Sequence, residues 1–177
     1  DTKSFNHALK YVLRQDPDVV VLGEMREFET ISAGITAAET GHLVLSTIHT
    51  IYAVKTIDRI IDTYPSHQQM QARIQLSNVL KGVIALRLCL RADGQGRVPA
   101  TEVLIGTSTV KKLILENKIT EIYKVMEQGK YYGMHTFDQR LNQLFNEKVL
   151  TFEEAMDKAS NPDDLKLKLK GMFQETE

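Results

Sequence analysis

The chain has 177 residues, with 22 Lys and Arg against 23 Asp and Glu, which gives a formal net charge of −1. Such a balance creates no overall field that would hold nucleic acid or an anionic membrane, and we expect no nucleic-acid partner. With 42% hydrophobic and 25% charged residues, the composition excludes a disordered or collagen-like chain. No apolar run approaches the roughly 20 residues of a membrane-spanning helix, and the single Cys89 excludes an internal disulfide.

The first hundred residues alternate between helix-like and strand-like stretches. A helix capped by Ser4 is expected to end at residues 16–18 (DPD), because the residue before a proline avoids helical dihedrals. Residues 19–22 (VVVL) are apolar on both faces, which is typical of a central parallel strand covered by helices on both sides. An alanine-rich helix over about 28–40 then leads to a second apolar strand at 43–47.

Two further helices and a hairpin complete this first part of the chain. Helical spacing predicts a helix over 53–62, and Ser66 with Gln69 forms a capping-box pattern for a helix that runs to about residue 81. Two strands over 83–91 and 98–105 are joined by an Asp-Gly-Gln-Gly turn of hairpin type. We therefore expect an α/β layer here.

After Gly106 the pattern becomes helical to the end of the chain. The cap signals expected for these helices are Ser108, Thr136, Thr151 and the Asn161-Pro162 turn. We therefore predict two domains, an α/β domain over residues 1–106 and a helical domain over residues 107–177.

The most informative stretch is 13–27 (LRQDPDVVVLGEMRE), in which an apolar strand delivers Gly23 and Glu24 to its carboxyl end. Ligands bind at this edge of parallel sheets, and a glycine there lets another backbone or a phosphate come close. A carboxylate at this place can hold Mg²⁺ through its water shell, or orient a water for attack on a γ-phosphate. The alternative is that Glu24 simply begins an exposed loop.

The second informative stretch, 39–50 (ETGHLVLSTIHT), carries a histidine at each end of a strand. At about 3.3 Å per residue, the extended segment places His42 and His49 roughly 20 Å apart. If the two strands are parallel, His49 emerges at the same edge as Glu24. We expect His49 to contact a nucleotide phosphate or relay an interface signal, and His42 to pack structurally or contact a neighbouring subunit. Two ordinary half-buried histidines are the alternative.

Both stretches resemble the secretion ATPases of type IV pili and type II secretion, in which the first is the Walker B motif and the second the His box. Residues 53–62 (AVKTIDRIID), 96–107 (GRVPATEVLIGT) and 133–139 (GMHTFDQ) are similar to the retraction branch, the PilT-type twitching-motility ATPases. The likeness extends from about residue 4 to about 165. Assembly and type II secretion relatives usually carry a four-cysteine zinc module, which a chain with Cys89 alone cannot build.

The resemblance implies part of a RecA-like P-loop ATPase core with a C-terminal helical satellite. It also implies ATP and Mg²⁺ as cofactors, a homo-oligomeric ring that is normally a hexamer, and a place at the cytoplasmic side of the inner membrane. The partner would be the inner-membrane platform protein of the type IV pilus. Because the sequence contains no Gly-x-x-x-x-Gly-Lys-Ser/Thr loop, we expect the Walker A half to lie before residue 1 and this chain alone to be inactive.

The same resemblance assigns two groups of site residues. Glu24 and His49 are assigned to catalysis, and Glu24 is also expected to hold Mg²⁺ through water. Contacts with the nucleotide are assigned to Gly23, Arg26, Thr47 and His42.

Two positions depart from the family pattern. Glu27 stands where the Walker B signature usually ends in Asp, and the retained charge predicts little effect. Residues 110–116 (VKKLILE) occupy the place of the retraction branch's Ala-Ile-Arg-Asn-Leu-Ile-Arg-Glu motif. Lys111 keeps the first positive charge there, whereas Leu115 replaces the second arginine and removes a bidentate donor. The alternative for this segment is an ordinary amphipathic helix with its apolar positions facing inward.

The leading hypothesis is the carboxyl-terminal portion of a ring-forming motor that hydrolyses ATP to power pilus retraction. Two alternatives remain open from the sequence. One is an assembly or type II secretion ATPase that lacks the zinc module. The other is a non-catalytic oligomerisation or adaptor module whose helical half, about residues 107–172, docks partners.

Overall fold

The computed structural model of the chain describes residues 11, 12 and 14–173. The helix expected after Ser4 lies for the most part outside these residues. Contacts group the described chain into two compact units, one up to Lys81 together with Gly106–Ile122, and one comprising Gly82–Ile105 and the residues from Tyr123 onward. Since these units are groups of contacting residues and not a division along the sequence, the predicted boundary at residue 106 stays a prediction.

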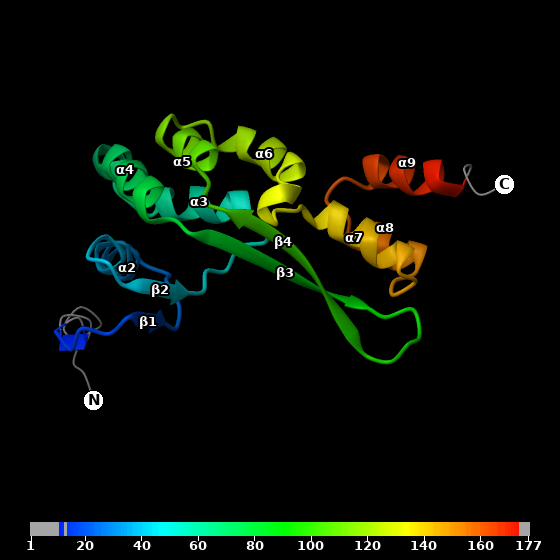
Figure 1. The fold of residues 1–177 in the computed structure, drawn as a ribbon, viewed down its shortest axis with the longest axis horizontal. Coiled ribbons are helices and arrows are strands. Elements are labelled where there is room, and N and C mark those ends of the chain that lie inside the picture. Colours follow the sequence, from blue (N-terminus) through cyan, green and yellow to red (C-terminus); the bar gives the residue numbers. More distant parts are fainter. Residues whose placement is uncertain (1–10, 13, 174–177) are drawn as a thin grey trace. The chain divides into compact units, whose positions relative to one another are not determined.

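The first unit contains a two-stranded parallel sheet. Strands β1 (Val19–Leu22) and β2 (Leu43–Ser46) pair along their whole length, with Val19 opposite Leu43 and Leu22 opposite Ser46 (Figure 1). Helix α2 (Phe28–Glu39) connects them, as a parallel pair requires a crossover and not a tight turn. The predicted strand–helix–strand order with parallel strands is confirmed.

Burial of the sheet differs from the prediction. Val20 and Leu22 are buried, and Val44 packs against them from β2. On the opposite face, Val19 and Val21 are 48% and 72% exposed. The prediction that helices cover both faces of this strand is therefore wrong for the described residues, because only one face of the sheet packs against a helix of this unit.

Helix α2 lies close to β1 because Gly34 has no side chain. A Cβ atom at Gly34 would come within 3.0 Å of both Leu22 Cδ1 and Met25 Sδ, which is tighter than ordinary van der Waals contact. This packing fixes the position of the segment that follows β1.

Helices α3 (Ala53–Asp62) and α4 (Gln69–Val79) follow, separated by the short 3-10 helix η1 (Ser66–Gln68). The bounds predicted for α3 are confirmed, and its buried face is lined by Ala53, Thr56, Ile57, Ile60 and Ile61. The predicted capping box is wrong, since no side chain caps η1 or α4. Instead, the Gln69 side-chain amide donates to the carbonyl of Tyr64 at 3.4 Å.

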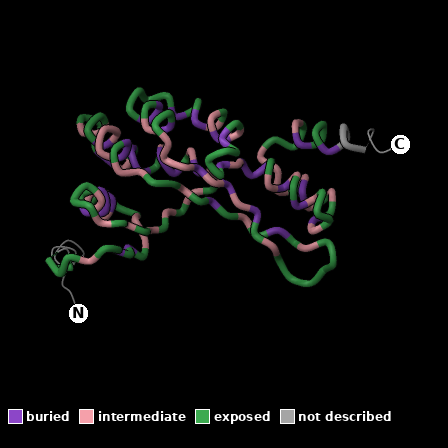
Figure 2. Tube along the Cα trace, viewed as in Figure 1, coloured by how far each residue is buried: buried purple, intermediate pink, exposed green. Residues whose placement is uncertain are grey.

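The second unit is built on a long antiparallel hairpin, β3 (Gly82–Leu90) and β4 (Arg97–Ile105), drawn as the two long arrows of Figure 1. Both strands lie within one residue of their predicted bounds, and the exposed turn between them is green in Figure 2. Cys89 is fully buried in β3, and this burial raises the pKa of its thiol. It is therefore a packed, protonated thiol.

The chain after Gly106 is helical throughout its described residues, as predicted, apart from a single bridge between Val103 and His135. The predicted caps at Thr136 and Thr151 are confirmed, and Gln139 completes a capping box with Thr136. The first of these helices is capped by Thr107 and not by the expected Ser108. The helices and 3-10 turns are α5 (Ser108–Leu115), η2 (Ile119–Glu121), α6 (Ile122–Gln128), η3 (Lys130–Tyr132), α7 (Phe137–Asn146), α8 (Phe152–Lys158) and α9 (Pro162–Phe173).

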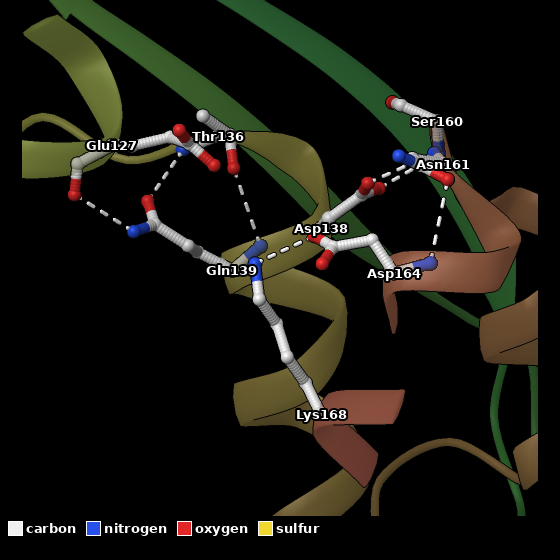
Figure 3. Close-up of polar contacts among 8 residues, drawn as sticks. All are labelled: Glu127, Thr136, Asp138, Gln139, Ser160, Asn161, Asp164 and Lys168. Carbon is white, nitrogen blue, oxygen red and sulfur yellow. Dashed lines mark hydrogen bonds and ion pairs between the residues drawn. The ribbon is translucent and has the colours of Figure 1, made fainter. Parts of the chain in front are cut away.

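A buried carboxylate joins α7 to the start of α9. Asp138 is 5% exposed and accepts hydrogen bonds from the backbone N–H groups of Ser160 at 2.7 Å and Asn161 at 2.9 Å (Figure 3). In the next residue, the Gln139 amide donates to the Glu127 carbonyl at 2.9 Å, which ties α7 to α6. Among the described residues, no helix is both long enough and apolar enough to cross a bilayer.

Candidate functional site

The candidate site lies in the two loops that follow β1 and β2. Because the strands are parallel, both loops leave the sheet at the same edge. Two hydrogen bonds join them: the Thr47 hydroxyl donates to the Gly23 carbonyl at 2.7 Å, and the Met25 N–H donates to the Thr47 carbonyl at 3.0 Å. Direct hydrogen bonds thus connect the two loops at the edge where parallel sheets bind ligands.

Glu24 is the centre of this arrangement. Its Oε1 lies 2.5 Å from Nε of Arg26 and 2.8 Å from Nε2 of His49. The side chain of Glu24 is 26% exposed, whereas those of Arg26 and His49 are 70% and 80% exposed. The strand geometry therefore predicted the placement of Glu24 and His49 at one edge correctly, while their chemical roles stay predictions.

The charges around Glu24 favour its ionised form. The hydrogen bond from Arg26 is the main reason why the pKa of Glu24 is lowered, and the charges of Arg26 and His49 add to it. In return, Glu24 raises the pKa of Arg26. At neutral pH Glu24 is consequently a carboxylate, able to accept hydrogen bonds or bind a cation, and not a proton donor.

His42 lies at the other end of the strand. Its Nδ1 is 3.1 Å from the carbonyl oxygen of Ala37 and 3.1 Å from the hydroxyl of Thr40. It thereby links the end of α2 to the start of β2, which is the structural role predicted from the strand length. The structure does not bring His42 together with Glu24, and the nucleotide contact that the resemblance assigned to His42 stays a prediction.

Gly23 is not needed for a close approach of protein backbone. A Cβ atom at this position would meet no heavy atom of the described residues within 4 Å. The expected approach of another backbone was therefore wrong for these residues, although the open space leaves room for a ligand. The bond that Gly23 accepts from Thr47 was missed, because a strand pattern carries no signal for side-chain contacts across a parallel pair.

A second contact missed by the sequence reasoning holds the far end of the His49 loop. The hydroxyl oxygens of Thr50 and Thr56 are 2.6 Å apart, and the Thr56 hydroxyl also lies 3.0 Å from the Tyr52 carbonyl, to which it donates. Thr56 is 8% exposed on the otherwise apolar face of α3. A polar residue on a buried helix face is the signal that could have indicated this contact.

The family is settled by comparison with known proteins. A family model described as type II/IV secretion system protein matches residues 2–98 of the chain. The chain belongs to this family.

Two curated relatives cover most of this secretion-family chain. A twitching motility protein of Neisseria gonorrhoeae is 46% identical over 164 residues, which is 93% of this chain and 44% of the relative. The type IV pilus retraction ATPase PilT of Pseudomonas aeruginosa is 43% identical over 164 residues, again 93% of this chain and 47% of the relative. The chain thus spans slightly less than half the length of these relatives.

A solved structure agrees with them. The crystal structure of the pilus retraction motor PilT with bound ADP superposes with a TM-score of 0.85 at 44% identity, covering 94% of this chain and 47% of that one. By comparison, the type IV pilus assembly ATPase PilB of Pseudomonas aeruginosa is 36% identical over only 56% of this chain. The predicted resemblance to the retraction branch and the predicted fold class, part of a RecA-like ATPase core, are confirmed.

Residues 110–116 depart from the motif of the retraction branch, and all but the last of them lie in helix α5. Its apolar positions Val110, Leu113 and Ile114 are buried, as the amphipathic alternative predicted. The Lys111 ammonium donates to the carbonyl of Asn78, in the last turn of α4, at 3.0 Å. Leu115 is 42% exposed, so the packing of this unit does not require a leucine at that position.

Proposed function

We propose that this chain supplies the carboxylate side of the nucleotide site in an ATP-hydrolysing motor that powers type IV pilus retraction. The observation that carries the proposal is the contact between Glu24 and His49 at the shared edge of two parallel strands, 2.8 Å apart. An ionised carboxylate beside exposed donors is the arrangement that phosphoryl transfer requires. A non-catalytic adaptor would have no need of it.

ATP and Mg²⁺ fit the residues present. The described residues contain no group of three or more side chains that could hold a metal ion, which argues against a dedicated metal cage. Mg²⁺ is instead usually held by one or two carboxylates, its own waters and the substrate's phosphates. When bound, the ion would neutralise charge on the phosphate oxygens. In the proposal Glu24 holds it through water or orients the attacking water.

The neighbours of Glu24 receive separate roles. His49 and Arg26 both carry exposed nitrogen donors at the edge, and we assign His49 to the γ-phosphate and Arg26 to the nucleotide. Gly23 and Thr47 line the same edge. His42 is left out of the nucleotide site, because its contacts are with the end of α2.

The proposal extends to the assembly. We propose that the protein acts as a homo-oligomeric ring, a hexamer, on the inner-membrane platform protein of the pilus. The names of the relatives support the link to pilus retraction. The ring would work at the cytoplasmic side, peripheral to the inner membrane, and without nucleic acid. The match to retraction relatives over 93% of the chain, against 56% for an assembly ATPase, supports retraction over assembly.

The Glu24→Gln variant tests the proposal, in the protein as its gene encodes it. The amide keeps the shape of the carboxylate but removes its charge, so we expect ATP turnover to fall about 10²–10⁴-fold while nucleotide affinity stays within about twofold. Glu153→Gln, an exposed acid in the first turn of α8, is the matched control and should turn over ATP normally. Undiminished turnover by Glu24→Gln would overturn the proposal.

A further inference from the structure

We propose that Thr47 is a positioning residue, whose hydroxyl and carbonyl groups hold Glu24 in place against His49. The inference rests on the proposed function, because it concerns the same site. The Thr47 hydroxyl has its partner in the Gly23 carbonyl at 2.7 Å, so the residue acts through the backbone of the neighbouring loop.

The two bonds made by Thr47 fall on either side of Glu24. The Gly23 carbonyl belongs to the peptide group that precedes Glu24, and it accepts from the Thr47 hydroxyl. The Met25 N–H belongs to the peptide group that follows Glu24, and it donates to the Thr47 carbonyl at 3.0 Å. Both peptide planes that set the direction of the Glu24 side chain are therefore fixed by one residue.

The position of Thr47 along its strand explains why it can do this. It follows Ser46, the last residue of β2, which pairs with Leu22, the last residue of β1. Thr47 thus extends the contact between the two strands into the loops by one step. The Thr47 carbonyl accepts from the Met25 N–H and fixes the peptide group after Glu24. The Thr47 hydroxyl fixes the peptide group before Glu24.

The same residue also limits the position of His49. Thr47 comes two positions before His49, and the Thr50–Thr56 hydroxyl contact at 2.6 Å anchors the loop just beyond it. His49 is consequently held from both sides, while its own side chain is 80% exposed. The contact between Glu24 and His49 depends on these anchors and not on burial of either side chain.

Loss of the Thr47 hydroxyl should change the rate more than the stability. A solvent-exposed hydrogen bond adds little to folding, because water replaces it. Reaction rates respond far more strongly to the placement of a reacting group, and a shift of about 1 Å can cost about 100-fold.

Three variants of the protein as its gene encodes it test the inference. Thr47→Val removes the hydroxyl with little change of shape, and Thr47→Ser retains it. Thr63→Val removes an exposed hydroxyl that donates to the Arg59 carbonyl, outside the two loops of the site. We expect Thr47→Val to lower kcat about 10- to 100-fold with the Kd for ADP within about twofold. Thr47→Ser should restore kcat to within about threefold, and Thr63→Val should match the unaltered protein.

Two outcomes would overturn the inference. One is an unchanged kcat in Thr47→Val. The other is a rise in the ADP Kd as large as the fall in kcat, which would show that the hydroxyl contacts the nucleotide directly.

Hydrogen exchange separates failure of this inference from failure of the proposed function. If the unaltered protein shows no ATP hydrolysis, the proposed function fails, and exchange at the Met25 amide still reports on the anchor. Thr47→Val should speed that exchange at least about tenfold, whereas Thr63→Val should not. Equal exchange in both variants would contradict the positioning role of Thr47.

Discussion

Nε2 of His49 lies 2.8 Å from Oε1 of Glu24, although the two residues belong to loops that follow different strands. The contact depends on the parallel register in which Leu22 faces Ser46. A slip of one residue in this register would turn the side chains of one strand to the other face of the sheet. The packing of α2 onto Val20 and Leu22 therefore supports the site as well as the fold.

The 177-residue chain alone should bind ATP weakly. Its sequence contains no Gly-x-x-x-x-Gly-Lys-Ser/Thr loop to surround the phosphates, so the groups around Glu24 would contact only part of the nucleotide. Isothermal titration with ATP and Mg²⁺ should give a Kd weaker than about 1 mM, a free energy of about −4 kcal/mol. Micromolar binding would show that the phosphates are held by other residues of this chain.

Asp138 should be required for the stability of the helical part of the second unit. Asp138→Ala leaves the N–H groups of Ser160 and Asn161 without their acceptor, which should lower the free energy of unfolding by about 2–4 kcal/mol in urea titrations. Asp138→Asn keeps one acceptor oxygen and should cost about half as much.

The control for Asp138 is Asp157→Ala, which removes a 65% exposed carboxylate paired with Lys158. This change should cost less than about 0.5 kcal/mol. Hydrogen exchange at the amides of residues 160 and 161 should speed up in Asp138→Ala alone. Equal stability of the two alanine variants would contradict the role given to Asp138.

His135 should make the second unit less stable in mild acid. Burial lowers the pKa of His135 from its ordinary value of 6.5, and the charge of Arg140 lowers it further. The unfolded chain therefore binds the proton more tightly, so the stabilising contribution is complete above about pH 6.5 and is lost as the pH falls through the folded pKa. Urea midpoints at pH 7.5 and 5.0 should converge in His135→Gln.

The control for this pH effect is His67→Gln, in which an exposed histidine beside Gln68 is replaced. It should keep the acid sensitivity of the unaltered chain. The glutamine at residue 135 can still bond to the Thr101 hydroxyl, which lies 3.0 Å from Nε2 of the histidine. An unchanged acid response in His135→Gln would show that another group is responsible.

Lys111 should stabilise the contact between α4 and α5. Lys111→Met removes a charged donor from the Asn78 carbonyl in the last turn of α4, at an expected cost of about 0.5–1 kcal/mol. Lys112→Met removes only an exposed pair with Glu116 at 3.7 Å and should cost less than about 0.5 kcal/mol. Denaturant titrations of the two variants decide the matter, and a larger loss in Lys112→Met would contradict this role.

The sequence was sufficient for the features that follow from local chemistry. Apolar runs and helical spacing located β1, β2 and α3, and the cap at Thr136 was predicted because a threonine before a helical stretch is a local signal. The placement of His49 at the same sheet edge as Glu24 followed from strand length and parallel pairing. The same approach failed for the cap at Ser66, because Ser66 begins the 3-10 helix η1, whose N-cap is Pro65, and the Gln69 side chain donates to the Tyr64 carbonyl.

The remaining features depend on contacts that no local pattern encodes. The bond from Thr47 to Gly23 crosses two strands, and the two N–H groups bound by Asp138 belong to a loop well beyond it in the sequence. Likewise, the apolar run of β1 predicted a strand covered on both faces, and nothing in the run shows which face the described residues leave exposed. Val21, at 72% exposed, shows that difference.

A double-mutant cycle between Glu24 and His49 tests most directly whether the two residues act as one catalytic unit. Single-turnover rates of ATP hydrolysis would be measured for the protein as its gene encodes it, for Glu24→Gln, for His49→Gln and for the double variant. If the contact between them serves catalysis, the rate of the double variant should lie within about threefold of the rate of Glu24→Gln. The reason is that loss of Glu24 already removes the contribution that both residues make together. Losses that multiply independently would contradict the account.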